Sequence, residues 1–186
     1  MAYKDETLTF ASDKIYYTVD DLELEVMMDW EDDIMKASAD YVCENGGDIL
    51  EIGFGMGIAA NYIQANSITS HTIVELHPQI IEKAKAWAVG KSNVTIVEGD
   101  WYEVKNSLST YDGVFYDTWG EDDWSKFGNN IASLCKSGAK ATWWNNYDSA
   151  TTIQSIEGVE YDTISVNPPP NMYFASNTYY LPKKQF

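Results

Sequence analysis

The chain has 186 residues, of which 45% are hydrophobic and 22% charged, a composition typical of one folded domain rather than a disordered protein. Its formal net charge is −17, and all twelve of its basic residues are lysine. Nucleic acids and anionic membranes are therefore poor partner classes, because both are bound mainly through basic side chains.

The N-terminal part of the chain predicts an arm followed by a long helix. Residues 1–21 are polar and aromatic with weak periodicity, and we interpret them as an arm or lid. Apolar residues recur at helical spacing across Leu22–Cys43, which predicts a helix. Asp20 or Asp21 is placed to cap the start of this helix, and Asn45-Gly46-Gly47 to end it.

From residue 48 onward, strand and helix patterns alternate. The predicted strands are Asp48–Ile52, His71–Leu76, Val94–Val97, Gly113–Asp117, Ala139–Trp144, Tyr161–Val166 and Met172–Ser176. The predicted helices are Gly57–Asn66, Pro78–Val89, Asp122–Lys136 and a short one at Ser149–Ile156. This order predicts a single α/β domain over residues 1–186, with a Rossmann-like, mostly parallel seven-stranded sheet covered by helices on both faces. The last two strands have no long crossover between them, so an antiparallel strand is expected at the C-terminus.

The sequence also indicates where the protein resides. No apolar run is long enough to cross a bilayer, and Met1–Phe10 lacks the apolar core of a signal peptide. Cys43 and Cys135 lie far apart, so we expect free thiols in a cytoplasmic protein. His71 and His77 offer no zinc-ligand spacing, and we predict no metal.

A glycine-rich turn, Gly53-Phe54-Gly55-Met56-Gly57, follows the first of these alternating strands. Glycine permits positive φ and the close approach of a ligand, and open α/β sheets bind ligands beyond the carboxyl ends of their strands. The spacing G-x-G-x-G differs from the dinucleotide pattern G-x-G-x-x-G, and Glu51 would repel a pyrophosphate. A carboxylate at this place suits the cationic amino group or sulfonium of S-adenosylmethionine (AdoMet).

Two more acidic residues occupy corresponding places after the next strands. Glu75 ends the second strand, where a carboxylate can accept from both ribose hydroxyls. Asp100 and Trp101 follow the third strand, where they can contact the adenine amino group and ring. Each residue alone has an ordinary structural alternative, such as helix capping by Asp100. Their occurrence in order after successive strands predicts an AdoMet site.

Several segments resemble the guanidinoacetate N-methyltransferase family. Glu51–Met56 resembles its motif I with G-F-G-M, Val26–Glu31 its V-M-x-x-W-E segment, and Tyr116–Thr118 its Y-D-T motif. Tyr173–Ala175 and Tyr180–Pro182 echo its final strand. The resemblance covers most of residues 22–182 and implies a class I AdoMet-dependent N-methyltransferase that converts guanidinoacetate into creatine.

The resemblance also implies the site residues. The implied AdoMet-binding residues are Met27, Met35, Glu51, Gly53, Phe54, Gly55, Met56, Gly57, Ile58, Ala59, Glu75, Leu76, His77, Asp100 and Trp101. The implied substrate-binding residues are Glu31, Asp117, Thr118, Asn146 and Tyr147, of which Glu31 and Asp117 contact the guanidino group. Asn146 and Tyr147 match the pair whose backbone amides hold the substrate carboxylate.

The chemistry of a guanidino acceptor explains why two acids are needed. A guanidinium has no nucleophilic lone pair, so the site must remove a proton, and two carboxylates can both grip the group and take that proton. Asp117, at the end of the fourth strand, is the candidate base, and Glu31 is its partner. The alternatives are a turn cap for Asp117 and a solvated acidic helix face for Asp29–Asp33.

Two other functions remain open from the sequence. One is N-methylation of a different small amine or guanidine, or of protein arginine, although an arginine enzyme usually needs a further β-rich domain. The other is AdoMet binding without catalysis, since the segment after Asn146 is shorter than in the family. The expected partner is a small molecule, and the sequence does not fix a monomer or a homodimer.

Overall fold

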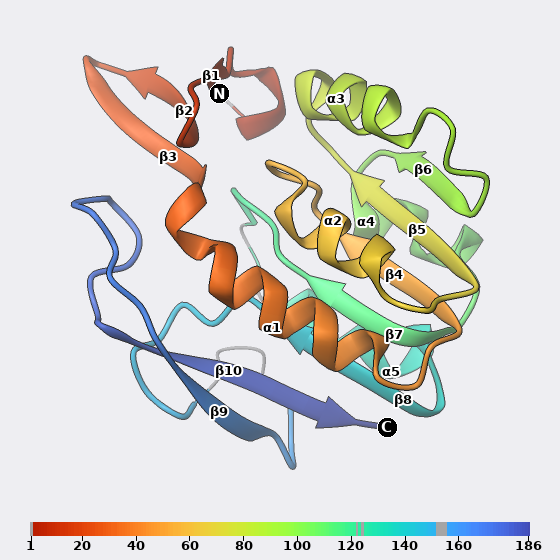
Figure 1. Ribbon diagram of the computed structural model, residues 1–186. Helices are drawn as coiled ribbons and strands as arrows, with labels where there is room; N and C mark the ends of the chain where they lie inside the picture. Colours follow the sequence, from red (N-terminus) through yellow and green to blue (C-terminus); the bar gives the residue numbers. More distant parts are fainter. Residues whose placement is uncertain (1, 122, 124, 152–155) are drawn as a thin grey trace.

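The protein consists of a seven-stranded sheet between two layers of helices, with a smaller three-stranded sheet formed by the N-terminal residues (Figure 1). This architecture comes from a computed structural model that describes residues 2–121, 123, 125–151 and 156–186. The predicted class of fold is therefore confirmed.

The N-terminal arm is a small antiparallel sheet. A 3₁₀ turn, η1 (Tyr3–Asp5), leads into β1 (Thr9–Phe10), β2 (Lys14–Val19) and β3 (Leu22–Met28). Asp20 and Asp21, with φ of 50° and 64°, form the turn between β2 and β3, because two left-handed residues match the twist of a hairpin. The prediction that one of them caps a helix was wrong.

The helix expected across Leu22–Cys43 begins only at residue 32. The first seven residues of this predicted range form β3, and the next three form the 3₁₀ turn η2 (Asp29–Glu31). Only the remaining residues, α1 (Asp32–Cys43), form an α-helix. Residues 22–26 alternate apolar and acidic, a strand period that the longer helical spacing concealed. Glu31 consequently lies in the turn before α1 rather than on the helix. Positive φ at Gly46 and Gly47 follows α1, as predicted.

The large sheet has the order β6-β5-β4-β7-β8-β10-β9. Its strands are β4 (Asp48–Ile52), β5 (Ser70–Glu75), β6 (Val94–Glu98), β7 (Tyr111–Tyr116), β8 (Cys135–Trp143), β9 (Glu160–Ser165) and β10 (Thr178–Gln185). The pairs among β6, β5, β4, β7 and β8 are parallel, whereas β10 runs antiparallel to both β8 and β9. The order reverses at β4, so the end of β4 is where an α/β sheet is expected to bind its ligand.

The strand predicted at Met172–Ser176 was wrong, because these residues form a loop and the last strand begins at Thr178. The side-chain oxygen of Asn171 accepts from the backbone amides of Tyr173 and Phe174, at 3.0 and 2.8 Å. An asparagine bonded to the backbone that follows it holds a turn in place of a strand.

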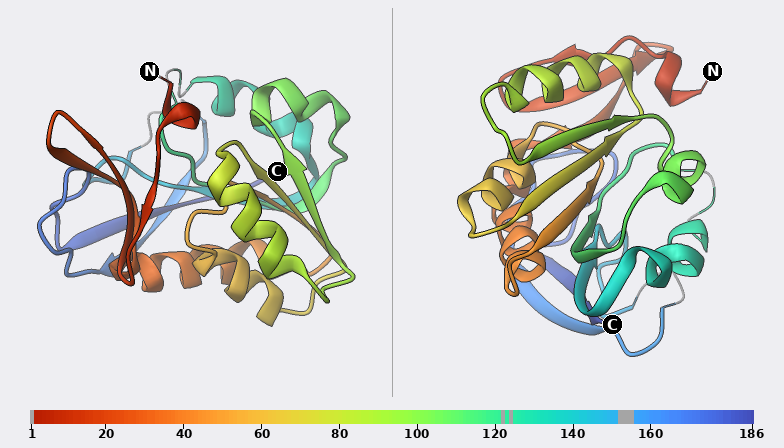
Figure 2. Two further views of the ribbon diagram at one scale, coloured as in Figure 1. Left: turned by 90° about the horizontal axis from the view of Figure 1, so that it is seen from above. Right: turned by 90° about the vertical axis from the view of Figure 1, so that its right-hand side faces the viewer.

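Helices cover both faces of the large sheet. α1, α2 (Ile58–Ala65) and α3 (Pro78–Ala88) lie on one face, while α4 (Trp101–Val104), η3 (Lys105–Ser107) and α5 (Ser125–Leu134) lie on the other (Figure 2). α5 is shorter than predicted because β8 begins directly after it. The helix expected at Ser149–Ile156 falls partly on residues 152–155, outside the described part of the chain, and residues 149–151 are not helical. None of the described helices has the length and apolar composition needed to cross a bilayer.

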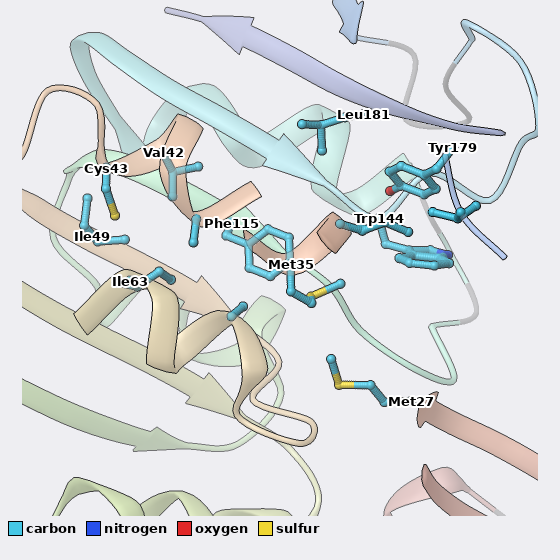
Figure 3. Close-up of a cluster of buried hydrophobic side chains, with 14 of the residues drawn as sticks. Met27, Met35, Val42, Cys43, Ile49, Ile63, Phe115, Trp144, Tyr179 and Leu181 are labelled. Atoms are coloured by element: carbon cyan, nitrogen blue, oxygen red, sulfur yellow. The ribbon is translucent and has the colours of Figure 1, made fainter. Parts of the chain in front are cut away.

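Apolar clusters on both faces hold the helices to the sheet, and two of them are the largest. The first joins α1 and α2 to the strands and includes Met35, Ile49, Phe115 and Tyr179, with Met27 from β3 at its edge (Figure 3). In the second, on the opposite face, Phe127 of α5 packs among the aromatic residues of β7 and β8. Because Met27 joins the first cluster, the N-terminal sheet is anchored beside the carboxyl end of β4.

Candidate functional site

A cavity lies where β4, β5, β6 and β7 end and the N-terminal residues come closest to them. Among the predicted cofactor residues, those that line it are Met27, Met35, Glu51, Gly53, Phe54, Gly55, Ala59, Glu75, Leu76, Asp100 and Trp101. The other four, Met56, Gly57, Ile58 and His77, do not line it. The cavity therefore brings together residues that follow three successive strands.

The glycine-rich turn is packed so closely that side chains cannot be added to it. Gly53, Gly55 and Gly57 have φ of 93°, 52° and 76°. A Cβ on Gly53 would lie 1.7 Å from the carbonyl oxygen of Asp117, and one on Gly55 would lie 2.4 Å from the sulfur of Met27. The turn thus needs glycine for its backbone angles and for the contacts behind it.

Glu51 places a fully buried carboxylate in the cavity wall. Its Oε2 lies 2.8 Å from Nε2 of His71, whose other ring nitrogen lies 3.3 Å from the amide of Gln64. Neither oxygen of Glu51 has a well-aligned hydrogen bond within the described residues. Burial raises the pKa of Glu51, which the nearby imidazole opposes. A buried carboxylate with unused acceptor capacity suits a cationic ligand, so this wall fits the charged groups of AdoMet.

Glu75 shapes the turn as well as the cavity. Its two oxygens accept from the backbone amides of Phe54, Leu76 and His77, each at 2.8 Å. A carboxylate offers about four acceptor positions, so about one remains for a ribose hydroxyl. Burial raises the pKa of Glu75, and these three amides oppose the rise. Ribose binding by Glu75 remains a prediction, with room for fewer bonds than the two expected.

Asp100 and Trp101 lie at the start of α4. Asp100 caps the helix by accepting from the amide of Tyr102 at 2.8 Å, which is the structural alternative considered above. Trp101 is buried, and its Nε1 donates to Glu121 at 3.0 Å. Both residues still line the cavity. Contacts of Asp100 and Trp101 with adenine remain predictions.

Asp117 and Glu31 form an acidic pair next to the cavity. Asp117 follows β7 and lines the cavity, and its side chain has no hydrogen bond or ion pair with any described residue. Burial, then the charges of Glu51 and Glu75, raise the pKa of Asp117 to about 7. Burial, then the charge of Asp117, raise the pKa of Glu31 to about 8. Two neighbouring acids with pKa values near neutrality can bind a cation and exchange its proton.

Glu31 is held from two sides by hydrogen bonds to a single oxygen. Its Oε1 accepts from the backbone amide of Met28 at 2.7 Å and from the hydroxyl of Tyr173 at 2.6 Å. Glu31 is 3% exposed and is not itself among the residues that line the cavity. The alternative reading of Glu31 as part of a solvated acidic helix face is therefore wrong.

Asn146 and Tyr147 are exposed and lie outside the cavity wall. The backbone amide of Tyr147 donates to the side-chain oxygen of Asn145 at 3.0 Å. One of the two amides expected to hold a substrate carboxylate is therefore already used. Thr118 does line the cavity, and its hydroxyl donates to that of Tyr116 at 3.1 Å.

Comparison with known proteins agrees with this geometry. The family model for guanidinoacetate N-methyltransferase matches residues 6–165. This chain belongs to the guanidinoacetate N-methyltransferase family. Membership confirms the predicted methyltransferase class, with AdoMet as the cofactor.

Curated relatives carry a different name from the family model. The chain is 30% identical to protein arginine N-methyltransferase 2 of Yarrowia lipolytica, over 86% of this chain and 41% of that protein. It is 34% identical to the protein of the same name from Kluyveromyces lactis, over 87% of this chain and 47% of that protein. The chain thus spans less than half the length of these relatives.

Solved structures share the fold at low sequence identity. The N-methyltransferase NodS from Bradyrhizobium japonicum, in complex with S-adenosyl-L-homocysteine, superposes with a TM-score of 0.68 at 13% identity, covering 84% of this chain and 87% of that one. Spermidine synthase from Thermotoga maritima superposes with a TM-score of 0.63 at 10% identity, covering 96% and 72%.

The structure adds residues to the site to which the sequence had assigned no role there. Tyr3 reaches the cavity from the N-terminal arm, and Trp119 and Glu121 reach it from the segment after β7. Tyr173 binds Glu31 and lies beyond the matched range of the family model. These contacts link segments up to 142 positions apart, and no local pattern in the sequence could have revealed them.

Proposed function

We propose that this protein transfers a methyl group from AdoMet to a nitrogen of a guanidino compound, with guanidinoacetate as the small-molecule acceptor. The observation that carries the proposal is the acidic pair beside the cavity, formed by buried Glu31 and half-buried Asp117. Their raised pKa values, about 8 and about 7, indicate groups that are costly to ionise until a cation arrives. A guanidinium satisfies that requirement and matches the planar geometry of carboxylates.

The chain's own residues supply binding and proton removal. Glu51, Glu75, Asp100 and Trp101 would hold the cofactor, which supplies an electrophilic methyl group. Asp117 takes a proton from the bound guanidinium, and the nitrogen thereby gains the lone pair that attacks. Glu31 keeps its charge opposite the remaining N–H groups and fixes the direction of that lone pair. Alignment of the two reactants accounts for much of the rate in such a displacement.

A second acceptor, an arginine side chain within a protein, is favoured by two observations. The curated relatives are named protein arginine N-methyltransferase 2. The amide of Tyr147 is engaged by Asn145, and no lysine is among the described residues that line the cavity, so a free carboxylate has few donors there. An arginine residue within a protein presents the same guanidino group, but its α-carboxyl group forms a peptide bond and carries no charge.

Transfer from radiolabelled AdoMet tests both acceptors. Guanidinoacetate, free arginine and an arginine-containing peptide are incubated in parallel with the wild type and with Asp117→Asn. Removing a general base typically costs about 100-fold or more in kcat, while calorimetry should show that S-adenosylhomocysteine still binds. Asp29→Asn, an exposed charge loss two residues before Glu31, is the matched control.

The result assigns the function directly. Methylated guanidinoacetate supports the first acceptor, and methylated peptide alone supports the second. Cofactor binding with no methylated acceptor of either kind would favour the non-catalytic module. A fully active Asp117→Asn variant would remove Asp117 from the mechanism.

A further inference from the structure

The loop between β9 and β10 contributes a residue that contacts the acidic pair, although the match to the family model ends at residue 165, before that loop. Tyr173 in this loop donates its hydroxyl to Oε1 of Glu31 at 2.6 Å. The backbone amide of Met28 donates to the same oxygen at 2.7 Å. One oxygen of Glu31 is therefore occupied by two donors from the protein, and Oε2 is left for another partner.

The loop holds Tyr173 in a defined position. Asn171 accepts from the amides of Tyr173 and Phe174 and donates to the carbonyl of Phe174 at 2.8 Å. The amide of Met172 donates to the buried carboxylate of Glu25 on β3 at 3.2 Å. The loop is thus fixed within itself and to the strand that leads into Glu31.

Aromatic packing restricts the ring of Tyr173 further. It stacks on Trp30, with ring centroids 6.1 Å apart and planes at 25°, and meets Trp119 and Trp144 edge-on at 6.1 and 5.9 Å. Phe174 stacks on the same Trp30 at 5.8 Å. A ring enclosed by three indoles cannot easily turn its hydroxyl away from Glu31.

We propose that Tyr173 is a positioning residue: it occupies Oε1 of Glu31 so that only Oε2 can receive an N–H of the guanidino acceptor. This inference rests on the proposed function. It assigns to the β9–β10 loop a part in acceptor binding, whereas the resemblance gave Tyr173–Ala175 no role in the site. A hydrogen bond to a carboxylate also favours its charged form, which the acceptor cation requires.

The test compares Tyr173→Phe with the wild type across pH 6–9.5. Loss of the donor disfavours ionised Glu31, so the acid limb of kcat/KM should move to higher pH by about one unit. At pH 7 we expect a fall in kcat/KM of about tenfold, mainly through KM, and a smaller deficit at pH 9. A structural defect would lower activity equally at every pH. Tyr161→Phe on β9, whose hydroxyl has no hydrogen-bond partner in the described chain, should leave the profile unchanged.

Two further measurements separate this inference from the proposed function. In a Glu31→Gln background, Tyr173→Phe should cost little more, because the carboxylate that it positions is gone. Carbon-13 titration of the Glu31 carboxyl, in protein bound to S-adenosylhomocysteine, should show that Tyr173→Phe raises its pKa to the same extent, without any turnover. An unmoved titration and an unmoved pH profile in an active Tyr173→Phe variant would overturn the role of Tyr173. An upward titration shift in a protein that methylates no guanidino compound would instead overturn the proposed function, together with the acceptor part of this inference.

Discussion

Replacing His71 by Phe tests how the wall of the cofactor cavity is stabilised. Side-chain exposure is 0% for His71 and 1% for Glu51, and their nearest atoms are 2.8 Å apart. Phe fills a similar volume but leaves the Glu51 carboxylate buried without its partner. Breaking a buried pair in this way costs about 3–5 kcal/mol. For a chain of this length, each kcal/mol lowers Tm by about 2–4 °C, so we expect a drop of about 6–20 °C.

Thermal unfolding followed by circular dichroism measures this drop, and the other histidine provides the control. His77 caps α3 by accepting from the amide of Gln79 at 3.2 Å, and loss of a cap costs about 0.5–2 kcal/mol. His77→Ala should therefore lower Tm by less than His71→Phe. If His71→Phe melts within about 2 °C of the wild type, the buried pair does not stabilise the fold.

A double variant separates the charge from the packing. Adding Glu51→Leu to His71→Phe removes the carboxylate that His71→Phe leaves buried without a partner. Replacing both members of a buried pair with apolar residues often changes the free energy of unfolding very little. We expect Tm to recover toward the wild type. Binding of S-adenosylhomocysteine, measured by calorimetry, should remain weak, because the acidic wall of the cavity is gone. Recovery of binding together with Tm would contradict the assignment of Glu51 to the cofactor.

Two other predictions concern the pH dependence of stability and the glycine turn. The pKa values of Glu31 and Asp117 are raised on folding to about 8 and about 7, whereas in the unfolded chain they titrate near 4. Folding therefore retains protons that the unfolded chain releases, and the free energy of unfolding should fall as pH rises from about 5 to 8. The fall should be less steep in a variant carrying Glu31→Gln and Asp117→Asn, and urea titrations at several pH values measure it. An equal slope in the two proteins would argue against titration of these two groups in the folded state. Gly53→Ala should abolish cofactor binding and lower the free energy of unfolding by more than about 2 kcal/mol, since its Cβ would meet the Asp117 carbonyl. Gly90→Ala, at a similar φ of 83° but with nothing within 4 Å, should lower it by about 1 kcal/mol. Equal losses of stability would show that backbone strain alone matters.

The parallel part of the fold could be predicted because each strand there is a short apolar run that ends in a recognisable turn. β4, with the glycines that follow it, is the clearest case, and its bounds were predicted without error. β3 could not be recognised, because Leu22–Met28 fits both a period of two and a period near 3.6. The hairpin turn at Asp20 and Asp21 decides between them, and aspartate in a left-handed conformation has no distinct local signal.

The same distinction between local patterns and long-range contacts applies to the candidate site. Residues that follow strands, such as Glu75 and Asp117, could be found because chain order and sheet topology together fix where they meet. Tyr173 could not, because its contact with Glu31 depends on how a long loop returns across the end of the sheet. Stacking on Trp30 and the Asn171 turn determine that return, and neither has a period that a sequence pattern can detect. We therefore expect the residues that determine which guanidino acceptor is bound to lie in the loops. Contacts made by loops are the hardest to predict from sequence, and loops vary more among homologues than the elements they connect.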